Sequence, residues 1–179
     1  MTAQIEFPAL ADLVFVPYLN EQGEIDPNFE KKIGVYSIFD AGKNLQLVAY
    51  SRDIYTSLKQ HLVRQPQACY WVKVKTIDRP RRSTLDEIKT AWLEENGTIP
   101  AGNRHQESAW CDPINAKLTM TEAEQQAYAE ADEIAQTKLL KNVARRLEAE
   151  IKETLKLRGV TMEIRFNPKL KEQGRLDLK

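Results

Sequence analysis

The sequence has no long hydrophobic run. None of its apolar stretches approaches the roughly eighteen residues that suggest a transmembrane helix. The N-terminal stretch also lacks the basic flank that precedes the apolar part of a secretory signal. We therefore expect a cytoplasmic protein that has no membrane partner.

Cysteine and histidine are scarce, with two of each in 179 residues. Cys69 and Cys111 are too few for a disulfide framework and have no metal-binding spacing. His61 and His105 are too far apart for a zinc signature. The sequence thus predicts reduced thiols and no resident metal site.

Net charge is also absent, because 26 basic residues balance 26 acidic ones. A protein that coats DNA would usually be basic overall, since its affinity comes from neutralising phosphates. The balance is uneven, because residues 51–100 carry nine basic and six acidic side chains and residues 151–179 carry eight and four. Any nucleic-acid surface must therefore be local, and a solvated surface of mixed charge is the ordinary alternative.

What the sequence does contain is a run of regular elements between residues 34 and 103. Two stretches rich in strand formers, GVYSIF and LQLVAY, flank a five-residue polar loop and predict a β-hairpin. Residues 51–62 then change to helical spacing, which predicts a helix that Ser51 or Asp53 caps.

A third strand and a second helix complete this run. Residues 68–77 alternate between apolar and polar side chains, which predicts a half-buried strand. Residues 83–96 have helical spacing, with Ser83 or Thr84 in capping position. The order β-β-α-β-α predicts an α+β fold in which helices flank a small antiparallel sheet.

The chain divides by pattern into three segments. Residues 1–33 form an irregular lead-in that packs on the core, and residues 34–115 form the main domain. Residues 116–179 begin with a long helix. A short strand at 160–166 and a polar tail at 167–179, mobile at its end, are expected to follow it.

The long helix is predicted over residues 121–158, where glycine and proline are absent. Thr121 and Glu124 form a capping box at its start. At about 1.5 Å per residue the helix would be roughly 55 Å long, so it bends, projects or joins another chain. The sequence leaves its continuity open. A narrow apolar stripe along it consists of Ala127, Ala131, Ile134, Leu139, Val143, Leu147, Ile151 and Leu155.

The pattern over residues 34–103 resembles the GIY-YIG nuclease superfamily. The resemblance rests on the element order, on GVY in the first strand, on His61 in the first helix and on IPAGN at 99–103. Within that superfamily it is similar to a cyanobacterial and plastid branch, which includes the nuclease-like N-terminal domain of a plastid monothiol glutaredoxin. The resemblance implies a GIY-YIG-like sheet with flanking helices.

Active members of the superfamily use a tyrosine, an arginine, a histidine and a glutamate that holds a divalent cation. Tyr36 and His61 match the first tyrosine and the histidine. The second triplet falls on LVA, and the arginine position is Ser57, which supplies no fixed positive charge. The metal-binding glutamate should fall near residues 89–91, which hold no carboxylate, and Glu87 is close by. Because losing one electrostatic stabiliser costs about 10²–10³-fold, the resemblance implies a site that no longer catalyses.

We therefore expect a non-catalytic binding protein that needs no cofactor. Its partner would be nucleic acid, or a protein chain or second copy that covers the apolar stripe of residues 121–158. The alternative is a nuclease that depends on Mg²⁺ or Mn²⁺ and uses a relocated site of Tyr36, His61 and Glu87. A weaker alternative is redox coupling through Cys69.

Basic side chains gather in the third predicted strand and in the turn that follows it. Tyr70 and Trp71 stand beside this run, which could follow a phosphate backbone and stack a base. The ordinary alternative is a solvated strand edge, on which lysines discourage edge pairing. The nucleic-acid candidates are Arg52, Lys73, Lys75, Arg79, Arg81 and Arg82. The long helix offers a second basic face with Lys138, Lys141, Arg145 and Arg146.

Overall fold

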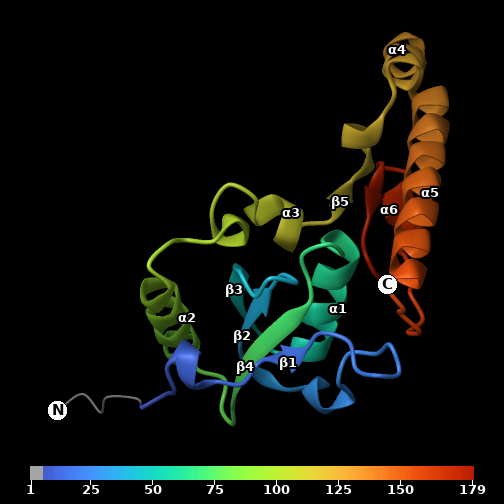
Figure 1. Cartoon of the computed structure of the whole chain (residues 1–179). Helices are drawn as coiled ribbons and strands as arrows, with labels where there is room; N and C mark the ends of the chain where they lie inside the picture. Colours follow the sequence, from blue (N-terminus) through green and yellow to red (C-terminus); the bar gives the residue numbers. More distant parts are fainter. Residues whose placement is uncertain (1–5) are drawn as a thin grey trace. The chain divides into compact units, whose positions relative to one another are not determined.

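The structure, a computed structural model, describes residues 6–179 and divides into two compact units (Figure 1). The first unit ends at Cys111, and the second runs from Asp112 to Lys179. The expected α+β fold is confirmed, with an antiparallel sheet and helices in the first unit and a long C-terminal helix in the second. Within residues 6–179, no helix combines the length and apolar character needed to cross a membrane.

Four strands form the sheet of the first unit: β1 (Val16–Pro17), β2 (Ile33–Phe39), β3 (Leu45–Ser51) and β4 (Trp71–Ile77). Their spatial order is β1-β4-β2-β3, and every neighbouring pair is antiparallel. Three of them are the strands that the sequence predicts. The fourth, β1, lies in the expected lead-in and pairs Val16 with Val72 at the edge of β4.

Two helices cover opposite faces of this sheet: α1 (Ile54–Arg64) and α2 (Arg82–Asn96). Side chains alternate between the two faces along a strand, so Val35 and Tyr36 point in opposite directions. Val35 packs in one core with Leu85 of α2. Tyr36 contacts His61 of α1 on the other face. Figure 1 shows α1 and α2 on either side of the strands.

The two helices begin differently. Asp53 caps α1 as predicted, because its side chain accepts a hydrogen bond from the Thr56 N–H at 3.3 Å. The expectation that Ser83 or Thr84 caps α2 is wrong, since both residues already lie inside the first turn. The N-cap residue is Arg81, whose side chain makes no capping hydrogen bond. The first N–H groups of α2 therefore lack the side-chain partner that usually neutralises a helix start.

The outer edge of β3 is closed by the segment that follows α2. In η3 (Ala101–Asn103), the Asn103 amide donates to the Val48 carbonyl at 2.7 Å and accepts from the Val48 N–H at 2.8 Å. A Cβ atom at Gly102 would lie 2.6 Å from a backbone oxygen of β3, so only glycine fits there. This segment thus occupies hydrogen-bonding groups that a further strand would need.

The second unit contains two helices where the sequence predicts one over 121–158. These are α4 (Glu122–Glu130) and α5 (Glu133–Leu157), and they are separated at Ala131, whose backbone is extended. Asp132 starts α5 because its side chain accepts a hydrogen bond from a backbone N–H of the first turn at 2.8 Å. A single capping residue therefore divides an otherwise helical stretch.

Much of the apolar stripe of residues 121–158 is covered by the second unit itself. Val143, Ile151 and Leu155 are buried, whereas Ile134 near the start of α5 is 83% exposed. Helix α5 packs against η4 (Ala116–Thr119), α4, α6 (Pro168–Lys171) and β6 (Arg175–Leu176). The C-terminal part of the stripe therefore needs no second chain to leave water.

The end of the chain differs from the prediction. Residues 160–166 do not form a strand, and their β pairing is the isolated bridge between Phe166 and Leu178. The terminal strand is instead β6, which pairs with β5 (Ile114–Asn115). The segment expected to be a mobile tail therefore carries a helix and a strand that join the second unit.

Candidate functional site

The two residues that best match the nuclease motif form a buried hydrogen-bonded pair. The Tyr36 hydroxyl of β2 lies 2.7 Å from Nε2 of His61 in the last turn of α1. The other ring nitrogen, Nδ1, lies 2.8 Å from the carbonyl oxygen of Trp110 in α3 (Glu107–Cys111). A carbonyl only accepts, so Nδ1 carries the proton, and in the neutral ring Nε2 accepts from Tyr36. Tyr36 is 2% exposed and His61 4%.

Burial shifts the pKa of both residues away from neutral pH. It lowers the pKa of His61 to about 4, although the hydrogen bond to Trp110 opposes the shift. It raises the pKa of the Tyr36 phenol well above its ordinary value, against a hydrogen-bonding interaction with the Ser57 side chain that lowers the pKa. Both groups are therefore neutral at pH 7, whereas a general acid or base works best with a pKa near the operating pH.

Small and apolar side chains occupy the positions where the resemblance implies an arginine and a second tyrosine. Ser57 donates from its hydroxyl to that of Ser51 at 2.7 Å, and Leu47 is fully buried. The nearest cation is one that sequence reasoning missed. Arg64, one turn beyond His61, donates from Nη1 to the same Trp110 carbonyl at 3.1 Å. Its charge also lowers the pKa of both Tyr36 and His61.

Glu87 does not join this pair. It is exposed on α2, which covers the opposite face of the sheet from Tyr36 and His61. Among residues 6–179, no group of three or more histidine, cysteine, aspartate and glutamate side chains is placed to hold a metal ion. The structure thus brings together two of the three residues of the relocated site.

The two cysteines lie in different parts of the first unit, Cys69 just before β4 and Cys111 at the end of α3. Cys69 is buried, and its thiol donates to the His61 carbonyl at 3.6 Å. Cys111 is exposed at the end of α3. Both are reduced thiols, and Cys69 has no surface from which to exchange with a second molecule.

Lys73, a nucleic-acid candidate, lies inside the first unit. Its ammonium group donates to the Leu10 carbonyl at 2.9 Å and stands 4.2 Å from the centre of the Phe15 ring. Burial lowers its pKa, against the attraction of Glu95 and Asp12. Its role is to hold the N-terminal segment onto the sheet rather than to face a phosphate backbone.

The exposed candidates gather where β3 ends and α2 begins. Arg79, Arg81 and Arg82 are exposed, and Lys75 is half-buried. Arg52 and Arg82 line one open groove of about 340 Å³. The other residues of this groove are Tyr50, Ser51, Pro80 and Leu85. The structure therefore joins two arginines that are far apart in the sequence.

The electrostatics of this groove favour an anion. Arg82 has a carboxylate 3.9 Å away on Asp86, but both side chains are largely exposed, so the pair is weak. The uncapped start of α2 adds the partial positive charge of its N–H groups. Lys89 places its ammonium group 5.8 Å from the centre of the Tyr50 ring. Sequence reasoning missed Tyr50, whose place beside Arg82 follows only from strand pairing and helix packing.

Comparison with known proteins gives one partial relative. The chain is 36% identical over 75 residues to a bifunctional monothiol glutaredoxin-S16, chloroplastic, of Arabidopsis thaliana. The match covers 40% of this chain and only 26% of that protein. No protein-family model matches the chain. The similarity is therefore to about a quarter of that relative, and the whole relative's activity is not carried over.

Proposed function

We propose that this chain is a non-catalytic binding protein of GIY-YIG-like fold whose ligand is single-stranded nucleic acid. The observation that carries the proposal is the groove in which Arg52 and Arg82 meet beside Tyr50 at the uncapped start of α2. Guanidinium groups match phosphate oxygens in a fixed fork, and helix N-termini attract anions. Arg79 and Arg81 extend the positive charge along the same turn.

The aromatic ring selects single strands over duplexes in this proposal. A base is free to stack on a side chain such as Tyr50 only when it is not already stacked within a double helix. A groove that combines cations with one ring is the usual surface for single strands. The chain has no net charge, so this local surface has to supply the phosphate contacts.

The lack of catalysis is supported by the state of the motif residues. Hydrolysis would need a phosphodiester beside Tyr36 and His61, but both are almost fully buried, and the His61 ring packs beside Trp110. Their pKa values, shifted by burial, also leave neither group able to exchange a proton readily at pH 7. The groove and the motif residues lie on opposite faces of the sheet, so binding at one does not deliver a ligand to the other.

The test is fluorescence polarisation with labelled single- and double-stranded DNA and RNA between about 50 and 200 mM salt. We expect tighter binding of single strands and a log-log salt slope that falls by about one in Arg52→Ala and again in Arg82→Ala. The matched control is Arg104→Ala, because Arg104 is exposed in the same unit but outside the groove. Equal binding by all three variants would contradict the proposal.

One observation favours the nuclease alternative, namely the position of Arg64 beside His61 and Trp110. If Arg64 replaces the missing arginine, the polarisation samples will show cleavage that requires Mg²⁺ or Mn²⁺ and is lost in both Tyr36→Phe and Arg64→Ala. We expect intact substrate in every tube. Cleavage that survives Tyr36→Phe would indicate a contaminating nuclease instead.

Two further expectations stay proposals. The first is a cytoplasmic setting, and the word chloroplastic belongs to the relative alone. The second is self-association through residues 121–158, at the exposed end that includes Ile134. Sedimentation velocity at several concentrations would detect self-association as a rise in sedimentation coefficient.

The redox alternative makes a separate prediction, namely that Cys69→Ser abolishes thiol–disulfide exchange.

A further inference from the structure

Basic side chains from two distant segments of the second unit converge on one pocket. The pocket has a volume of about 210 Å³ and lies between α5 and α6. Its lining residues are Lys141, Arg145, Pro168, Lys169, Lys171 and Glu172. The sequence shows these cations as two separate runs, and only the packing of the C-terminal segment onto α5 unites them.

The charge of this pocket is only partly neutralised. Lys141 pairs with Glu172 at 3.2 Å, but Glu172 is more than half exposed. Lys171 pairs with Glu148, whose carboxylate also bonds Lys152 at 3.1 Å. Among residues 6–179, neither Arg145 nor Lys169 has an ion pair. The four lining cations therefore face two carboxylates, Glu172 and Glu148, which leaves a net positive pocket.

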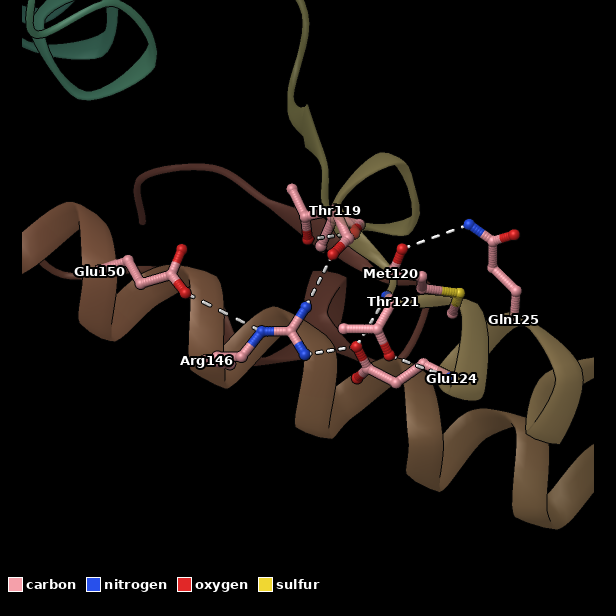
Figure 2. Close-up of polar contacts among 8 residues, drawn as sticks. Thr119, Met120, Thr121, Glu124, Gln125, Arg146 and Glu150 are labelled. Atoms are coloured by element: carbon pink, nitrogen blue, oxygen red, sulfur yellow. Dashed lines mark hydrogen bonds and ion pairs between the residues drawn. The ribbon is translucent and has the colours of Figure 1, made fainter.

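The neighbouring residue Arg146 differs from Arg145, because carboxylates hold its side chain in place. Figure 2 shows Arg146 held on three sides, by Glu124, by the Thr119 carbonyl at 2.9 Å and by Glu150 at 3.9 Å. Thr121 completes the predicted capping box with Glu124, so Arg146 ties the start of α4 to α5. Arg146 thus has a structural role, whereas Arg145 lines the pocket between α5 and α6.

We propose that this pocket binds a phosphate group, carried by inorganic phosphate or by a small phosphorylated molecule. Its volume is below the 300–1,000 Å³ usual for whole drug-sized ligands, so it suits a single anionic group. One guanidinium and three ammonium groups supply donors for the phosphate oxygens. The charge of a phosphate dianion offsets most of the excess positive charge, which a carboxylate would offset less.

The experiment is a phosphate titration of the full ¹⁵N-labelled chain at constant ionic strength, with chloride replaced by phosphate. We expect saturable amide shifts at residues 141–148 and 167–173. The double variant Arg145→Ala/Lys169→Ala should weaken binding at least tenfold. Lys138→Ala is the matched control, since Lys138 is exposed on the same helix but outside the pocket. A wild-type chain without saturable shifts would overturn the proposal.

A second variant keeps the test independent of any folding defect. Glu172→Gln removes the carboxylate that competes for Lys141, so binding of phosphate should tighten. Unchanged or weaker binding in Glu172→Gln would contradict the proposed site. Glycerol phosphate and a nucleoside monophosphate, titrated in parallel, separate the sources of the phosphate group. Tighter binding of either ester than of inorganic phosphate assigns the site to a phosphorylated molecule, and weaker binding of both assigns it to inorganic phosphate. Arg52→Ala and Arg82→Ala should leave these shifts unchanged. The phosphate proposal for this pocket is therefore tested independently of the single-strand proposal for the groove of the first unit.

Discussion

The two faces of the sheet in the first unit use polar side chains in opposite ways. On one face, Tyr36 and His61 satisfy each other under Trp110 and are almost fully buried. On the other face, Arg52 and Arg82 border an open groove at the start of α2. The residues that carry the sequence resemblance thus serve the core, and the residues that suit a ligand lie elsewhere. A motif match in the sequence therefore does not by itself locate a site that can reach a ligand.

The largest effect is expected from a variant that removes the Trp110 ring, which packs beside His61. Trp110→Ala should lower the free energy of unfolding by about 3–5 kcal/mol, because it deletes a fully buried indole. It should also raise the pKa of His61 toward its ordinary value, since burial is the main cause of the shift. Urea unfolding and NMR titration of the His61 ring measure these two effects.

The control for this variant is Ser108→Ala on the same short helix. Ser108 is exposed, so its replacement should change the free energy of unfolding by less than about 0.5 kcal/mol. If Trp110→Ala cost no more than Ser108→Ala, the indole would not be the cover of the pair. Binding of single strands should be equal in both variants, because the groove lies on the other face.

The second test uses pH. The folded-state pKa of His61, about 4, lies below its ordinary value of 6.5. Between these values the unfolded chain binds a proton that the folded chain does not. The stability from neutral His61 is therefore fully present above pH 6.5 and is lost as the pH falls toward 4. Between pH 7 and pH 5 the free energy of unfolding should fall by about 2 kcal/mol.

Comparison with His61→Gln isolates this term from the carboxylates. Both chains are unfolded with denaturant at pH 5, 6 and 7. Between pH 7 and pH 5 the free energy of unfolding should decrease much less in His61→Gln than in the wild-type chain. If the two chains kept the same pH dependence, His61 would titrate normally and would not be buried as a neutral ring. The exposed His105 stays in both chains and cancels from the difference.

The fold of residues 34–103 could be predicted because its signals are local. The strand-forming residues of β2, the alternation of β4, the four-residue spacing of α1 and the Asp53 cap each depend on neighbours in sequence. Non-local pairing could not be predicted in the same way. Two residues, Val16–Pro17, become a strand only because the edge of β4 is available, and Arg175–Leu176 pair only because Ile114–Asn115 are near.

The candidate site divides along the same line. The sequence matched Tyr36 and His61 separately to the motif, and the structure places the Tyr36 hydroxyl 2.7 Å from the His61 ring nitrogen. It treated Lys73 as a surface cation, because alternation cannot show that the N-terminal segment folds back over that side chain. The grouping of Arg52 with Arg82 likewise requires the packing of α2 on the sheet. Burial of a polar residue is a tertiary property, and strand periodicity alone does not encode it.

The smallest expected effect sharpens the comparison on the groove side. Arg82→Lys keeps the charge but replaces the planar fork with a single ammonium group. The free energy of unfolding should change by less than about 0.5 kcal/mol, since Arg82 is exposed and its pair with Asp86 is weak. Single-strand affinity should fall severalfold while the salt slope stays near that of the wild-type chain, because the number of phosphate contacts is unchanged. Polarisation titrations at several salt concentrations separate the two quantities. If the salt slope fell as far as in Arg82→Ala, the lysine would not reach the phosphate. If Arg82→Lys kept the full affinity, charge alone would be needed at this position and the guanidinium fork would not be used.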